Sequence, residues 1–113
     1  MNELSSMSCS PPKTGGPPLD SSEFETYLTQ LPGWEVHEVD GIKRITRQYK
    51  FNNFLSALKF TNKVGALAEQ EDHHPTILTE WGRVSVTWWT HAVNGLHIND
   101  FICASKTDQI LNE

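Results

Sequence analysis

Long apolar runs are missing from this 113-residue sequence, and none approaches the roughly 20 residues that a transmembrane helix needs. The first 18 residues also lack the apolar centre of a secretory signal peptide. We therefore expect no membrane span and no secretion, and hence a cytoplasmic location. The composition, 37% hydrophobic and 20% charged, is that of one ordinary globular domain with a modest core.

Basic residues and cysteines are also few. Nine Lys and Arg stand against 14 Asp and Glu, giving a formal net charge of −5, and the basic residues are scattered along the chain. Because contacts with phosphates need clustered positive charge, we expect no general binding to nucleic acid.

The two cysteines are Cys9, in a polar N-terminal stretch, and Cys103, in an expected helix. The sequence gives no reason to pair them, and two unpaired thiols suit a reducing compartment.

The N-terminal stretch 1–18 offers almost nothing to bury. It is rich in Ser, Pro and Gly, a composition typical of segments that do not fold on their own. We predict that residues 1–18 form a disordered extension that contributes nothing to fold or chemistry. Residues 19–113 are then expected to form the single folded domain.

Hydrophobic periodicity and turn signals predict the element order α-β-β-α-β-β-α. Ser22 and Glu25 form a capping-box pattern at the start of the first helix, and Asn52 or Asn53 caps the long middle helix. Asp40-Gly41 is a strong signal for a two-residue hairpin. The expected ranges are, in order, 22–31, 34–39, 42–51, 53–71, 76–81, 83–90 and a final helix from about residue 99.

Two hairpins separated by a helix predict an α+β fold, with a four-stranded antiparallel sheet and helices packed on one face. The middle helix should bury a stripe at helical spacing, formed by Phe54, Ala57, Leu58, Thr61, Val64, Leu67 and Ala68. The other face of such a sheet is uncovered and one strand edge stays open. This predicts a homo-oligomer, either a dimer or a tetramer.

Polar side chains capable of acid–base chemistry fall at the ends of these elements. His73 and His74 stand before Pro75, which disfavours helical backbone at His74, so the pair lies on a helix-to-strand turn where neighbouring side chains diverge. His91 follows a strand, and Asp100 lies in the first turn of the last helix. Since imidazole gives or takes a proton near neutral pH, this pattern predicts an acid–base site.

Each of these residues also has a purely structural interpretation. The histidines could be satisfied by buried or backbone partners, and Asp100 could cap its helix. Glu69, one turn before the histidines, could be a solvated helix end, and Trp34 could be either a pocket wall or a core residue. Trp88 is assigned to the core, and the two remaining histidines, His37 and His97, are expected at the surface without a role.

One multi-part pattern runs through nearly the whole chain, from about residue 19 to residue 110. Its parts are Gly33-Trp34, Phe51-x-x-Phe54, Glu69-x-x-x-His73-His74-Pro75, Trp81 in an aromatic position, Thr90-His91, Gly95-Leu96 and Asp100. This pattern resembles the pterin-4a-carbinolamine dehydratase family. Trp81 stands where tyrosine is common in the family, and Ala92-Val93 replaces the more polar Glu-Cys of animal members.

The resemblance implies dehydration of a 4a-hydroxytetrahydropterin, such as 4a-hydroxytetrahydrobiopterin, to a quinonoid dihydropterin. This step recycles the pterin after aromatic amino-acid hydroxylation, so a functional link to such a hydroxylase is implied as well. No redox cofactor or metal is required, because no electrons move. The implied catalytic residues are His73, His74, His91 and Asp100, and the implied substrate-binding residues are Glu69, Trp34 and Asp72. Acids on both sides of the ring, such as His73 and His91, would let one site handle both stereoisomers.

Other classes of function stay open at this stage. Histidines together with Asp or Glu could bind zinc or iron, although adjacent histidines that diverge are poorly placed to share an ion. Animal members of the family also act as dimerisation cofactors for a homeodomain transcription factor, and nothing in this sequence carries that role. A relative that acts on another pterin, such as a molybdopterin precursor, is a further alternative.

Overall fold

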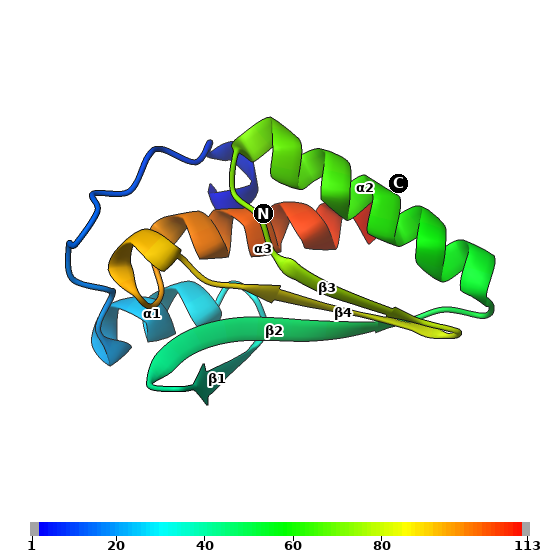
Figure 1. Cartoon of the computed structure of the whole chain (residues 1–113), viewed down its shortest axis with the longest axis horizontal. Coiled ribbons are helices and arrows are strands. Elements are labelled where there is room, and N and C mark those ends of the chain that lie inside the picture. Colours follow the sequence, from blue (N-terminus) through cyan, green and yellow to red (C-terminus); the bar gives the residue numbers. More distant parts are fainter. Residues whose placement is uncertain (1–2, 112–113) are drawn as a thin grey trace.

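The computed structural model describes residues 3–111 and confirms the α+β fold with a four-stranded antiparallel sheet. The strands follow the order β1-β2-β4-β3, and α2 and α3 run across one face of the sheet (Figure 1). In chain order the elements are η1 (Glu3–Ser6), α1 (Ser21–Leu28), β1 (Glu35–Val39), β2 (Ile42–Lys50), α2 (Phe54–Glu71), β3 (Thr76–Glu80), β4 (Arg83–Trp88), η2 (His91–Val93) and α3 (Ile98–Leu111).

The predicted hairpin at Asp40-Gly41 is confirmed. Both residues have positive φ, 53° and 79°, as a two-residue turn matched to the strand twist requires. The turn sets the register of β1 and β2, in which Val36 lies opposite Ile45. It thereby places Ile45 and Tyr49 of β2 in the core under the helices.

The first helix is capped two residues earlier than predicted. Asp20, not Ser22, is the N-cap, because its side chain accepts a hydrogen bond from the Glu23 amide at 2.9 Å. Glu23 completes the capping box by accepting from the Asp20 amide at 3.0 Å. The sequence offers two overlapping capping patterns, and the carboxylate of Asp20 is the one that is used.

The buried stripe of α2 differs from the predicted one. Asn53 caps the helix as expected. Phe54 and Leu58, however, are 46% and 38% exposed, whereas Phe60 is buried and packs on the rings of Tyr49 and Phe51. The helix is therefore turned towards the aromatic residues at and just beyond the end of β2. Its buried residues are Ala57, Phe60, Val64, Leu67 and Ala68.

The N-terminal segment packs against the domain, contrary to the prediction of a disordered extension. η1 contacts α3, and Leu4 is only 2% exposed within the hydrophobic core. Further along, the Gly15 amide donates to the Ala92 carbonyl at 2.8 Å. The Ser-, Pro- and Gly-rich composition of the segment does not predict this packing, because a single leucine and a few polar contacts hold the segment in place.

Replacing Leu4 with alanine should lower the free energy of unfolding by about 2–4 kcal/mol, the usual cost of truncating a buried leucine. Met7→Ala is the matched control, since Met7 lies in the same segment with an exposed side chain and its replacement should cost less than about 0.5 kcal/mol. Urea denaturation of both variants measures the difference. Equal stability of the two variants would show that Leu4 does not belong to the core.

Candidate active site

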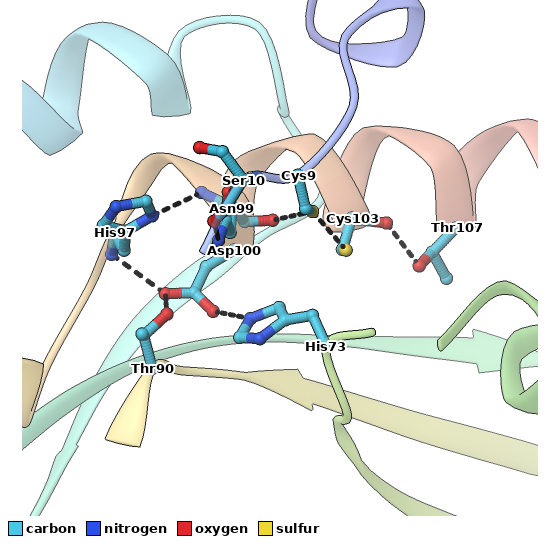
Figure 2. A network of polar contacts seen from close by, with 9 residues as sticks. All are labelled: Cys9, Ser10, His73, Thr90, His97, Asn99, Asp100, Cys103 and Thr107. Carbon is cyan, nitrogen blue, oxygen red and sulfur yellow. Dashed lines mark hydrogen bonds and ion pairs between the residues drawn. The ribbon is translucent and has the colours of Figure 1, made fainter. Parts of the chain in front are cut away.

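Asp100 is the centre of the polar cluster in Figure 2. Its carboxylate is 0% exposed and lies in the first turn of α3. One oxygen, Oδ1, lies 2.6 Å from His73 Nε2, while Oδ2 accepts from Thr90 Oγ1 at 2.8 Å and from the His97 amide at 3.0 Å. Three groups surround an acceptor-only carboxylate, so Asp100 is well satisfied as an anion and holds these groups in place.

His73 reaches Asp100 because α2 ends sharply just before it. Asp72 adopts the left-handed conformation with φ 51° and closes the helix, and the His73 amide donates back to the Ala68 carbonyl at 3.1 Å. The imidazole stacks on Trp88 with ring centroids 5.4 Å apart and is 12% exposed. Since Asp100 accepts at Nε2, the neutral ring carries its proton there, and Nδ1 is the nitrogen that can take up a proton.

His74 diverges from His73, as expected for neighbours on an extended turn. Its Nε2 pairs with Glu69 Oε2 on the last turns of α2. Both side chains are open to solvent, 58% exposed for His74 and 78% for Glu69. The turn therefore offers one histidine fixed by a buried carboxylate and one that solvent or a ligand can reach.

His91 follows the C-terminal end of β4, the same end at which His73 stacks on Trp88, and is exposed. Its ring packs on Trp89 at 3.8 Å between centroids, and the guanidinium of Arg44 lies 4.4 Å from the centroid of the same indole. Successive residues of an extended chain point to opposite sides, so the ring contacts of His73 with Trp88, the last residue of β4, and of His91 with Trp89, the next residue, lie on two sides of the chain.

Two of the residues expected to bind substrate are placed differently. Trp34 is buried in the core and donates its indole N–H to Asp108. Asp108 lies near the C-terminal end of α3, whereas Asp100 lies in the first turn of that helix. The structure does not bring it to the histidines, so the core interpretation holds. Asp72 is next to His73 with an exposed side chain, and its visible role is to end α2.

Thr90 and His97 are part of the cluster although the sequence did not single out their contacts with Asp100. His97 was expected at the surface, yet its amide donates to Asp100 and its Nδ1 accepts from the Asn99 amide at 3.1 Å. The available signal was its position three residues before Asp100, where a helix-initiating carboxylate reaches a free amide.

Burial lowers the pKa of His97 below its usual value; the charge on Asp100 opposes the shift and that on His73 adds to it. A lowered folded-state pKa means that the unfolded chain binds more protons as pH falls. The contribution of His97 to stability should therefore be present above pH ~6.5 and be lost on acidification. His97→Asn, whose Oδ1 can replace Nδ1 as the acceptor, should flatten the fall in melting temperature between neutral and mildly acidic pH. An unchanged pH profile would contradict this assignment.

Within residues 3–111, no helix is long and apolar enough to cross a membrane. The same part of the chain holds no group of three or more His, Cys, Asp or Glu arranged to bind a metal ion.

A hollow of about 360 Å³ lies away from the histidine cluster. It is lined by residues 18–21, Phe24, the β1–β2 turn and residues 94–96, and by none of the site histidines.

The fold and the cluster define a small α+β protein with an acid–base site of histidines around a buried carboxylate at the α2–β3 junction. Comparison with known families identifies its group. The family described as Pterin 4 alpha carbinolamine dehydratase matches residues 17–110, and the chain belongs to this family.

Relatives match the chain over nearly its whole length. A protein from Syntrophotalea carbinolica named "Putative pterin-4-alpha-carbinolamine dehydratase" is 49% identical, covering 98% of this chain and 99% of the relative. A protein of the same name from Nitrosococcus oceani is 51% identical, covering 98% of each. The crystal structure of a transcriptional coactivator/pterin dehydratase from Brucella melitensis is similar with a TM-score of 0.74 and 39% identity, covering 82% of this chain and 97% of that one.

Proposed function

We propose that the protein is a pterin-4a-carbinolamine dehydratase that converts a 4a-hydroxytetrahydropterin to a quinonoid dihydropterin and water. The observation that carries the proposal is the His73–Asp100 pair at 2.6 Å beside the reachable His74–Glu69 pair, in a chain of this family. In the cell the enzyme would act in the cytoplasm on the product of an aromatic amino-acid hydroxylase.

The chemistry needs an acid and a base with pKa values near ambient pH. The hydroxyl on C4a leaves as water once it is protonated, ring-nitrogen electrons replace the broken C–O bond, and a nitrogen proton is lost. Histidine suits both proton transfers. His74 and His91 are the exposed imidazoles that can meet the substrate, and His73 is oriented by Asp100 with Nδ1 available. Glu69 and Asp72 would contact the polar edge of the pterin.

Direct measurement of dehydratase turnover on freshly generated carbinolamine tests the proposal. Alanine at His73 or His74 should lower the rate by about 10²- to 10⁴-fold, the usual cost of losing a general acid or base. His37→Ala is the matched control, because His37 is exposed on β1, away from the cluster, and its replacement should leave the rate unchanged. Wild-type protein without turnover, or equal loss in all three variants, would overturn the proposal.

The opposite sides on which His73 contacts Trp88 and His91 contacts Trp89 suggest how both stereoisomers could be served. If His73 and His91 act on opposite faces of the pterin ring, alanine at each position should impair a different stereoisomer. His74→Ala should impair both alike. Comparing the rates with separately prepared isomers measures this, and equal losses for both isomers in the His73 and His91 variants would contradict the two-sided arrangement.

We also propose that the protein is a homo-oligomer. β3 is an edge strand, and large apolar side chains of α2 and the β3–β4 hairpin are exposed, namely Phe54, Leu55, Leu58, Leu78 and Trp81. Light scattering at micromolar concentration should show a dimer or larger. The double variant Leu55→Glu with Trp81→Glu should shift it towards monomer, whereas monomeric wild-type protein would remove the basis of this proposal.

A further inference from the structure

The two cysteines meet where the N-terminal segment crosses the first turns of α3. Cys9 Sγ lies 3.4 Å from Cys103 Sγ, although the residues are 94 positions apart in the sequence (Figure 2). No pattern in the sequence predicts this contact. The contact exists because the segment is held against the domain by its own backbone.

That backbone joins the two elements that carry the catalytic pair. The Cys9 amide donates to Glu71 Oε1 at 2.9 Å, at the end of α2 and two residues before His73. Ser10 exchanges two hydrogen bonds with Asn99, the neighbour of Asp100: its amide donates to Oδ1 at 3.2 Å, and its carbonyl accepts from Nδ2 at 2.7 Å. Residues 9 and 10 thus bridge the supports of His73 and Asp100.

The two sulfur atoms differ in access. Cys103 is fully buried in α3, whereas Cys9 is half-buried. The hydrogen bond with Cys9, followed by burial, raises the pKa of the Cys103 thiol, with the charges of Asp100 and Glu71 acting in the same direction. The Cys9 thiol can in turn donate to the Asn99 carbonyl, 3.7 Å away. Cys9 is therefore the sulfur that a reagent from solvent meets first.

We propose that Cys9 and Cys103 form a reversible thiol–disulfide site, which fastens the N-terminal segment to α3 when the protein meets a small disulfide such as oxidised glutathione. The deprotonated sulfur of Cys9 attacks the reagent, forming a mixed disulfide and releasing one glutathione thiol. Cys103 then attacks Cys9 Sγ and releases the second. Two S–H bonds are lost, one S–S bond forms, and the two electrons and two protons reduce the reagent to two thiols.

The geometry favours a bond within one chain over other outcomes. A disulfide has its sulfur atoms about 2.05 Å apart, so the sulfurs need to approach by a little over an ångström from their 3.4 Å contact. The bond would close a loop of nearly the whole chain and so restrict the unfolded state. We expect the melting temperature to rise by on the order of 10 °C on oxidation.

The test treats the reduced, folded full-length protein with excess oxidised glutathione at neutral pH and then labels the remaining thiols in denaturant. Intact mass should show a single chain that has lost two hydrogen atoms and carries no label. The melting temperature should rise, and a dithiol reductant should reverse both changes. Retention of both thiols, a cross-link between two chains, or a disulfide that leaves the melting temperature unchanged or lower would overturn the proposal.

Single replacements separate the two roles. Cys103→Ser should stop at the mixed disulfide of Cys9 with glutathione, and Cys9→Ser should keep Cys103 unmodified while folded. If serine at the buried position prevents folding, Cys103→Ala, which leaves no polar atom there, replaces it. Modification of Cys103 at the wild-type rate in the Cys9→Ser protein would contradict the order of reaction. None of these measurements depends on dehydratase turnover.

Discussion

Replacing Asp100 with asparagine should lower dehydratase turnover by about 10²- to 10⁴-fold while the fold survives. The carbonyl oxygen of asparagine can still accept from Thr90 and His97, but its amide group then faces His73 Nε2 as a donor. His73 would have to move its proton to Nδ1, which leaves no basic nitrogen towards the substrate. Turnover across the pH range, together with circular dichroism to verify folding, measures the effect.

Asp108→Asn is the matched control for this experiment. It removes the same charge from the same helix, about two turns further along α3 and away from the histidines. Turnover should be retained at a temperature where both variants are folded. If Asp100→Asn also keeps wild-type turnover at every pH, Asp100 only caps its helix.

Replacing Asp108 with alanine should lower the free energy of unfolding by about 3 kcal/mol. Asp108 lies 2.8 Å from Arg47 Nη1 and accepts from the Tyr49 hydroxyl and from the Trp34 indole. Burial, followed by the hydrogen bond to Asp108, raises the pKa of Tyr49, so its hydroxyl stays a donor. Without the carboxylate, two largely buried donors lose their acceptor.

Glu80→Ala controls for the loss of a surface carboxylate. Glu80 pairs with Arg83 at 2.8 Å, and both side chains are widely exposed, so its removal should change stability by less than about 1 kcal/mol. Chemical denaturation of both variants gives the comparison. Equal losses would mean that the Asp108 cluster adds no more stability than an ordinary surface pair.

Local signals in the sequence predicted the parts of this structure that local forces decide. The turn at Asp40-Gly41 follows from backbone preferences, and the divergence of His73 and His74 follows from Pro75. The side of α2 that is buried was predicted less well, because Phe60 is selected by aromatic partners on another element. The spacing of apolar residues within one helix contains no information about partners on other elements.

Contacts between distant parts of the chain account for the remaining differences. Leu4 packs with residues near the other end of the sequence, and Trp34 finds its partner in Asp108. His97 joins the acid–base cluster through a backbone amide, and its position three residues before Asp100 is the one local signal for this contact. The sequence thus predicted the histidines and Asp100 as candidate site residues. The groups that orient them were identified only from the three-dimensional structure.

The packing of η1 on α3 bears on how the protein is made. Because η1 is synthesised before α3 and packs against it, this part of the core can close only once α3 has left the ribosome. Contacts of such long sequence separation also form late in folding, because a large loop must close before they form. The segment that bridges His73 and Asp100 therefore docks only after α3 has emerged, and maturation of the site waits for that helix.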